Sequence, residues 1–233
     1  MKEKAGLERS GAGVKDSFEA ELHCYTRNLL RLSAAAAMAA LAIHLGGIAF
    51  KGDASAFDAA LMRTLRTPSD LMAIGGPRIE RFVRDVTALG SFGVAAMLVS
   101  AVGGYLSMSG RWICARALLA IPVGGWLLSN AIKVAVARPR PDVVPMLDTV
   151  SDASMPSGHT MMATVLYFTL AGLIVMRTDN VRLRRLAFIC ALVLTIAVGL
   201  SRVYLGVHWP TDVLAAVALG AAWTAAGLRL LTK

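Results

Sequence analysis

The sequence predicts an all-α membrane protein, a six-transmembrane-helix bundle with one long loop. Of its 233 residues, 56% are hydrophobic and 17% charged, whereas a soluble domain is closer to a quarter charged. A helix needs about 20 apolar residues to cross the roughly 30 Å hydrocarbon core of a bilayer. Six stretches, rich in Gly and Ala that suit close packing in lipid, have that length or nearly so. They are residues 29–50, 87–107, 113–132, 158–176, 185–200 and 211–231.

The chain before the first predicted span is polar. Residues 1–28 carry mixed charge, and we expect them to form a cytoplasmic N-terminal tail. The apolar run that follows is too long for the core of a signal peptide, so we expect it to remain as a membrane anchor. The predicted organisation is therefore a tail, residues 1–28, and a six-span membrane domain, residues 29–233.

The first external loop, residues 51–86, is the only long one between predicted spans. Turn sequences at 67–70 and 75–77 divide it into two pieces. In the second piece, apolar side chains recur at helical spacing at Ile79, Phe82, Val83 and Val86. The loop is thus expected to contain short amphipathic helices that lie on the membrane surface or pack over the bundle. A structural lid and a gate for substrate both fit this loop.

The distribution of Lys and Arg predicts the orientation. Positive side chains are in slight excess on the side of the N-terminus. The excess is clearer when Lys133, Arg140 and Arg202, which are assigned to chemistry below, are set aside. Because cytoplasmic loops carry this excess, both termini are expected in the cytoplasm. The net charge of +9 is spread over the span ends, which suits anionic lipid headgroups rather than nucleic acid.

The three cysteines predict neither a disulfide framework nor a metal site. Cys24, Cys114 and Cys190 fall in the cytoplasm or within the membrane in this orientation, where disulfides are rare. Their spacing does not resemble a zinc site. We expect no metal and no other cofactor.

The first candidate site segment ends the third predicted span. Lys133 and Arg140 are seven residues apart, which is two turns of a helix, so they are expected on one face. Pro139 and Pro141 predict an extended or turn-like exit from the membrane. Two cations at a membrane boundary suit an anion, although for this segment alone anchoring to lipid headgroups is the better explanation.

The second segment opens the fourth predicted span with Pro156, Ser157, Gly158 and His159. Ser157 is a favoured N-cap residue, and Gly158 lets an anion approach the backbone. The free N–H groups and the dipole of a helix N-terminus form a ready phosphate site. His159 is placed to donate a proton there, although a Ser-Gly-His turn by itself is a weak signal.

The third segment joins the fifth span to the sixth. His208 and Asp212 are four residues apart, so on a helix they would touch. Pro210 fits the first turn of that helix. A carboxylate on one imidazole nitrogen fixes the tautomer and leaves the other nitrogen free to attack. Arg202 supplies a third cation.

The membrane topology brings the three segments to one side. Spans three and five end, and spans four and six begin, on the same side of the membrane whichever way the protein is inserted. We therefore expect three cations, one helix N-terminus and two histidines to meet there. The candidate site residues are Lys133, Arg140, Ser157, Gly158, His159, Arg202, His208 and Asp212.

Together the segments resemble the signature of the type 2 phosphatidic acid phosphatase family. The pattern Lys-x6-Arg-Pro, then Pro-Ser-Gly-His, then Ser-Arg-x5-His-x3-Asp is present in full and in order. The resemblance covers about residues 87–231. Six spans and a long first external loop are usual in this family, which shares its fold and phosphate pocket with the soluble vanadate-dependent haloperoxidases.

The resemblance implies an integral-membrane phosphatase that hydrolyses a lipid phosphate through a phosphohistidine. His208 would attack phosphorus, Asp212 would orient it, and His159 would protonate the leaving oxygen and then activate water. The phosphate would be held without a metal by Lys133, Arg140, Ser157, Gly158 and Arg202.

Two other classes of protein share these residues. A phosphotransferase would pass the phosphoryl group to another lipid or sugar, and a non-catalytic binder or scramblase would only hold the lipid phosphate. The intact set of His208, Asp212 and His159 argues against the binder. The Ala-rich, short-looped chain suits a multi-pass protein of the bacterial inner membrane, with its site facing the periplasm. Its partners are then membrane lipids, and the oligomeric state is open.

Undecaprenyl diphosphate is the first candidate substrate. The basic first loop and Arg138, near the site, could hold its second phosphate. Pairing of these arginines with acidic neighbours such as Asp58 or Glu80 would remove that argument. Phosphatidic acid, phosphatidylglycerol phosphate and a lipid A phosphate are the alternatives.

Overall fold

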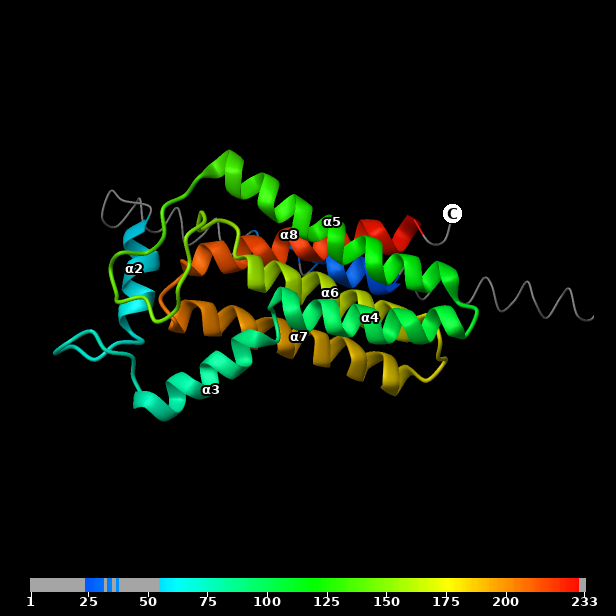
Figure 1. The fold of residues 1–233 in the computed structure, drawn as a ribbon, viewed down its shortest axis with the longest axis horizontal. Coiled ribbons are helices and arrows are strands. Elements are labelled where there is room, and N and C mark those ends of the chain that lie inside the picture. The colour runs from blue at the N-terminus through cyan, green and yellow to red at the C-terminus, as the bar shows by residue number, and fades with distance from the viewer. Residues whose placement is uncertain (1–23, 32, 35–36, 38–54, 231–233) are drawn as a thin grey trace, which may run out of the picture.

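The computed structural model describes residues 24–31, 33–34, 37 and 55–230. Within these ranges the chain forms helices and loops, and no strand. Figure 1 shows the long helices side by side in one bundle. The helices are α2 (Ser55–Arg63), α3 (Gly76–Ala88), α4 (Phe92–Met108), α5 (Trp112–Val136), α6 (Gly158–Val175), α7 (Val181–Tyr204) and α8 (Pro210–Arg229).

Four of these helices, α5 to α8, are long and apolar enough to cross a membrane. Helices α3 and α4 meet at a bend of 45° and together form a possible fifth span. The first expected span, residues 29–50, lies mostly outside the described residues, although residues 24–31 are helical. The described part of the chain is therefore all-helical, and it contains four or five of the six spans expected of a multi-pass membrane protein.

Helix α7 is longer than the span expected at residues 185–200. It begins at Val181 because the Asn180 side chain caps it, accepting hydrogen bonds from the backbone N–H groups of Arg182 and Leu183. The run of charged residues at its start is therefore part of the helix and not of the preceding loop.

Helix α6 is the centre of the bundle. Fourteen of its eighteen residues are buried, and it packs against α5, α7 and α8. A Cβ atom on Gly220 of α8 would lie 2.9 Å from Cβ of Thr164, so glycine is needed for this close approach. Helical residues 24–31 also pack on α6, where the Tyr25 hydroxyl donates a 2.6 Å hydrogen bond to the carbonyl of Phe168.

Helices α2 and α3 lie at the end of the bundle where α5 and α7 end and α6 and α8 begin (Figure 1). Helix α3 is the helix that the apolar spacing predicts. Its Val83 packs against a buried cluster at the end of α7, whereas Phe82 is 64% exposed. The members of that cluster are Tyr204, Leu205 and Val207.

The turn between α3 and α4 fits tightly against the first turn of α6. A Cβ atom on Gly90 would lie 2.7 Å from the carbonyl oxygen of His159 and 2.7 Å from Cγ1 of Val198. The Tyr167 hydroxyl donates a 2.7 Å hydrogen bond to the carbonyl of Leu89 in the same turn. These contacts fix the backbone of His159.

Candidate active site

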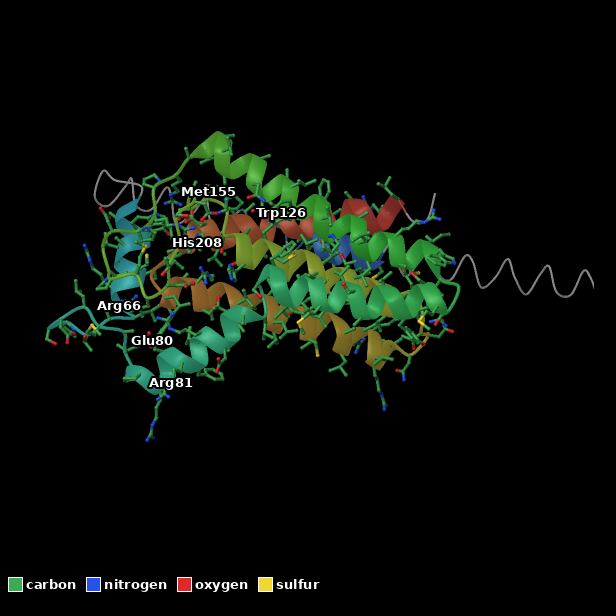
Figure 2. The ribbon with its side chains drawn as sticks, viewed as in Figure 1. Arg66, Glu80, Arg81, Trp126, Met155 and His208 are labelled. Atoms are coloured by element: carbon green, nitrogen blue, oxygen red, sulfur yellow. The ribbon has the colours of Figure 1, made fainter. Side chains whose placement is uncertain are left out.

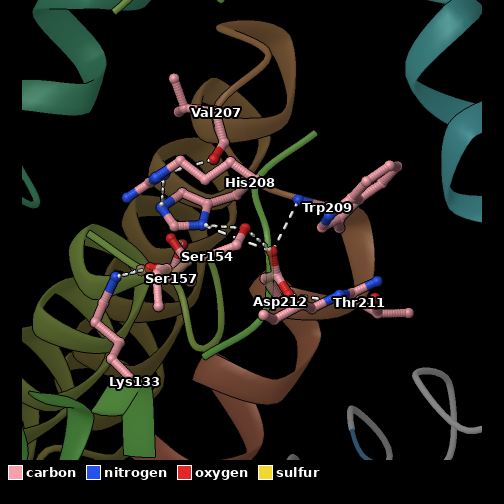
Figure 3. Close-up of polar contacts among 12 residues, drawn as sticks. Lys133, Ser154, Ser157, Val207, His208, Trp209, Thr211 and Asp212 are labelled. Carbon is pink, nitrogen blue, oxygen red and sulfur yellow. Dashed lines mark hydrogen bonds and ion pairs between the residues drawn. The ribbon is translucent and has the colours of Figure 1, made fainter. Parts of the chain in front are cut away.

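The three motif segments meet at the end of the bundle beside α2 and α3. Figure 2 shows His208 at this end, and Figure 3 shows its polar surroundings. Lys133 comes from the last turn of α5 and Arg202 from the last turn of α7. The full set of predicted residues at this end is Lys133, Arg140, Ser157, Gly158, His159, Arg202, His208 and Asp212.

Lys133 and Arg140 converge on one carboxylate. Nζ of Lys133 lies 2.7 Å from Oδ2 of Asp152, and Nη2 of Arg140 lies 2.5 Å from Oδ1. Their spacing predicts that the two cations share a helix face, and this prediction is wrong. Helix α5 ends at Val136, and Ala137 adopts a left-handed conformation with φ 48°. The chain turns there and brings Arg140 back over the site.

Asp152 is the counter-charge of this cation pair, which we call the cradle. Burial alone would raise the pKa of the Asp152 carboxyl, but hydrogen bonds and charges from Lys133 and Arg140 lower it to about 2. Its side chain is still 58% exposed. A solvent-accessible carboxylate thus forms ion pairs with two cations that are themselves largely buried.

Backbone carbonyls fix the direction of both cations. Lys133 donates a 2.5 Å hydrogen bond to the carbonyl of Ala153. Arg140 donates from Nε to the carbonyl of Asp152 at 2.8 Å and from Nη1 to that of Val207 at 2.6 Å. The cradle is therefore held in place by the loop between α5 and α6 and by the segment that carries His208.

His208 presents its two ring nitrogens to different groups. Nδ1 lies 3.5 Å from Oγ of Ser154 and 3.7 Å from Oδ2 of Asp212, and Nε2 lies 3.4 Å from Nη1 of Arg140. The Ser154 hydroxyl donates a 2.5 Å hydrogen bond to that same Asp212 oxygen. Figure 3 shows these three side chains facing one another.

The contact between His208 and Asp212 does not arise from helical spacing. His208 precedes Trp209, the N-cap residue of α8, so it lies outside the helix. Pro210 occupies the first turn as predicted. Asp212 accepts a 3.0 Å hydrogen bond from the backbone N–H of Trp209, and this capping contact turns its carboxylate toward His208.

The charge state of His208 follows from its surroundings. Burial of the imidazole lowers the pKa of His208 to about 4, Arg140 and Arg202 act in the same direction, and Asp212 opposes them. The ring is therefore neutral at pH 7, which is the state that a nucleophilic imidazole needs.

Arg202 is fully buried and paired. Its Nη1 donates to Oγ1 of Thr87 at 3.0 Å and to Oδ2 of Asp148 at 2.9 Å. Burial alone would raise the pKa of the Asp148 carboxyl, but Arg202 brings it below its ordinary value. Nε of Arg202 is buried without a hydrogen-bond partner among the described residues, so one donor is left for another ligand.

The start of α6 forms the floor of the site. Ser157 is the N-cap residue, but its hydroxyl makes no capping hydrogen bond; it accepts one of 3.0 Å from Oγ1 of Thr160 instead. A pocket of about 180 Å³ opens here, lined by Lys133, Gly158 and His159 among others. No three His, Cys, Asp or Glu side chains in the described ranges gather to hold a metal ion.

Sequence reasoning missed the acidic partners of the site. Asp148 and Asp152 lie between the first two motif segments, where Asp142 is the only other charged residue. All the charged residues of this loop are acidic, and the motifs on either side carry cations. A search for counter-charges to those cations would have identified the loop. Ser154 carried no such signal, because a lone serine in a loop is ordinary.

Residues 113–233 match the PAP2 superfamily. Phosphatidylglycerophosphatase B of Bacillus subtilis is 34% identical over 148 residues, which are 62% of this chain and 71% of that protein. Lipid A 1-phosphatase of Rhizobium johnstonii is 34% identical over 120 residues, 47% of this chain but only 44% of that protein. The crystal structure of a transmembrane PAP2 type phosphatidylglycerolphosphate phosphatase from Bacillus subtilis has a TM-score of 0.72 and 26% identity over 85% of this chain and 94% of that one.

The match runs from α5 to the C-terminal residues and so includes all three motif segments. The resemblance that these segments carry is thereby confirmed. The chain belongs to the PAP2 superfamily.

Proposed function

We propose that this protein is an integral-membrane phosphatase that hydrolyses a lipid phosphate through a covalent intermediate on His208. The observation that carries the proposal is the position of the His208 ring. Nδ1 is turned toward Ser154 and Asp212, while Nε2 lies beside Arg140 of the cradle. With the proton on Nδ1, the lone pair of Nε2 is directed at the place where the cradle would bind a phosphate.

The proposed reaction has two steps. Nε2 of His208 bonds to phosphorus while the bond to the lipid oxygen breaks, and His159 donates a proton to that oxygen. A water molecule then gives a proton to His159, and its oxygen attacks phosphorus and breaks the P–N bond, which releases phosphate. Lys133, Arg140 and Arg202 neutralise the non-bridging oxygens in both steps.

The start of α6 adds hydrogen bonds to this binding. The Ser157 hydroxyl and the backbone N–H of Gly158 are the donors we assign to the phosphate, since unpaired N–H groups at a helix N-terminus favour anions. Three cations and this helix end supply the positive charge that a metal ion supplies in other phosphatases. We therefore propose that the reaction is metal-independent.

An apolar groove beside the site supports a lipid substrate. The pocket at His159 shares Phe92, Trp126 and Met162 with a second pocket of about 180 Å³ between α4 and α5. The second pocket is lined mostly by apolar side chains, among them Val99 and Leu119. A phosphate at the cradle would thus have room for an attached apolar chain.

The identity of the lipid is a separate proposal. Arg138, which the sequence offers for the second phosphate of undecaprenyl diphosphate, is bound to Asp58 and Asp212. Among the basic residues of the first loop, Arg84 pairs with Glu80. Relatives named for phosphatidylglycerophosphate also cover most of this chain. We propose phosphatidylglycerophosphate as the first substrate to test and undecaprenyl diphosphate as the second.

We also propose that the site faces away from the cytoplasm of a bacterial inner membrane. The Lys and Arg asymmetry supports this orientation. Sealed right-side-out vesicles should hydrolyse a membrane-impermeant aryl phosphate added outside. Hydrolysis only after the vesicles are opened would reverse the assignment.

Purified protein in detergent should release inorganic phosphate from lipid phosphates in excess EDTA, and vanadate should inhibit it. His208→Ala should release none, whereas Arg84→Gln, a change at an exposed ion pair in α3, should be as active as wild type. Activity lost in EDTA and restored by Mg²⁺ would contradict the metal-free reaction. Appearance of a new phospholipid instead of free phosphate would identify a phosphotransferase.

The two histidines should differ in their dependence on the leaving group. A lipid alkoxide leaves poorly without a proton, so both His208→Ala and His159→Ala should fail on a lipid phosphate. With an aryl phosphate, His159→Ala should recover part of the burst of phenol, on the order of the 10²–10⁴-fold that general acid catalysis contributes. His208→Ala should recover nothing, and an equal loss of the burst in both variants would refute the assigned roles.

Asp152→Asn should strengthen the binding of phosphate-like anions. Asp152 pairs with Lys133 and Arg140 in the free protein, and we expect phosphate to compete for the same two cations. The inhibition constant of vanadate should fall by about tenfold, which is roughly 1.4 kcal/mol. Asp142→Asn, at an exposed position of the same loop, is the control. Weaker inhibition of Asp152→Asn would mean that Asp152 holds the cations in place for phosphate.

A further inference from the structure

Asp58 of α2 is fully buried and lies outside the three motif segments. Its Oδ2 lies 3.0 Å from Nη2 of Arg138, and its Oδ1 accepts a 3.1 Å hydrogen bond from the backbone N–H of Thr211. The Thr211 hydroxyl also donates to Oδ2. A carboxylate from α2 is therefore bound directly to the first turn of α8, the turn that contains Asp212.

Arg138 connects Asp58 with the site. Its Nη1 lies 2.6 Å from Oδ1 of Asp212 and donates to Oγ1 of Thr211 at 2.8 Å. Its guanidinium carbon is 5.4 Å from the centre of the Trp209 ring. A planar guanidinium binds the two carboxylates through separate nitrogens at fixed positions, whereas a lysine would have to bind both through one nitrogen.

The two oxygens of Asp212 have different partners. Oδ1 is paired with Arg138, while Oδ2 accepts hydrogen bonds from Ser154 and from the backbone N–H of Trp209. Oδ2 is also the oxygen that lies 3.7 Å from Nδ1 of His208. Because both oxygens are held, the carboxylate cannot rotate without breaking an ion pair, and the side of it that faces His208 is fixed.

We propose that Arg138 and Asp58 are positioning residues for the reaction at His208, an inference that rests on the function proposed above. Arg138 fixes the orientation of the Asp212 carboxylate and neutralises part of its charge. Asp58 holds Arg138 against the start of α8. Both act through Asp212 and not on the phosphate.

The neutralisation has a measurable consequence for the pH dependence. Asp212 favours the protonated form of His208, and the surrounding cations oppose it. The groups that act on His208 are Asp212 of α8, Arg140 after α5, Arg202 of α7 and His159 of α6, with Lys133 of α5 near His159 and Asp212. Without the charge of Arg138, the effect of Asp212 on the pKa of His208 would be stronger. The pKa of His208 would then rise, and the acid limb of kcat/KM, where neutral His208 is lost, would move to higher pH.

Four variants of the full chain test this proposal, with phosphate release followed over a range of pH on phosphatidylglycerophosphate and undecaprenyl diphosphate. Arg138→Gln should lower kcat by about 100-fold, as a small misplacement of a catalytic group does, with little change in KM. Its acid limb should shift up by about one pH unit. Arg138→Lys and Asp58→Asn keep a cation near Asp212, so they should lower kcat less and leave the acid limb in place. Arg84→Gln is the matched control and should behave as wild type.

Thermal unfolding and vanadate inhibition of each variant separate positioning from folding and from phosphate binding. Vanadate should bind Arg138→Gln nearly as tightly as wild type. If Arg138→Gln does not fold, a kcat loss at unchanged KM in Arg138→Lys and Asp58→Asn supports the proposal, and wild-type kcat in both contradicts it.

Two results would overturn the proposal while the phosphatase assignment stands. One is a folded Arg138→Gln enzyme with the wild-type acid limb. The other is a loss confined to the diphosphate substrate, which would mean that Arg138 binds the second phosphate. Failure of the wild-type protein to release phosphate from either lipid would instead contradict the proposed function itself.

Discussion

The gathering of three cations at one end of the helix bundle is the constraint on which the arrangement of the site depends. Taking an ion out of water costs several kcal/mol unless it is paired and hydrogen-bonded, and Lys133 and Arg202 are almost completely buried. The protein meets this cost with two aspartates from one loop. Asp152 pairs with Lys133 and Arg140, and Asp148 pairs with Arg202.

The loop between α5 and α6 must therefore fold back over the end of the bundle. Its Leu147 N–H donates a 2.9 Å hydrogen bond to the carbonyl of Leu205, and Ser154 from the same loop reaches Asp212. The ion pairs that stabilise the buried cations thus also hold the loop in the position that places Ser154 beside His208. On the other side of Asp212, Arg138 and Asp58 close the arrangement. The Asp212 carboxylate is consequently held, directly or through Arg138, by residues from α2, the loop and α8 together.

Most of the fold and of the proposed site could be predicted from the sequence, and the reason is specific. Apolar length alone predicts the four helices α5 to α8, and the parity of the spans places Lys133 and His208 on one side. What failed was local geometry: the first two cations do not share a helix face, because α5 ends before Arg140. Similarly, His208 lies outside α8 and meets Asp212 through a capping contact. Spacing rules assume that a helix continues, and these candidate site residues lie where helices stop.

The acidic partners could not be found from the motif, because they lie outside its three segments and are recognised only by the cations with which they pair. Asp58 is 153 residues from Thr211 in the chain, and only the folded structure brings the two together. The pairing of Arg138 with Asp212 could not be predicted either. Arg138 is close in sequence to the cations of the cradle, yet it pairs with Asp212 and not with Asp152.

The most direct test of this account is to trap the covalent intermediate. Protein mixed with a radiolabelled aryl phosphate should be quenched within one turnover under alkaline conditions, in which a phosphohistidine survives, and then digested and mapped by mass spectrometry. The proposed reaction predicts label on the peptide that contains His208, no label in His208→Ala, and a longer-lived adduct in His159→Ala. Label on another residue, or phosphate release by His208→Ala at the wild-type rate, would contradict it.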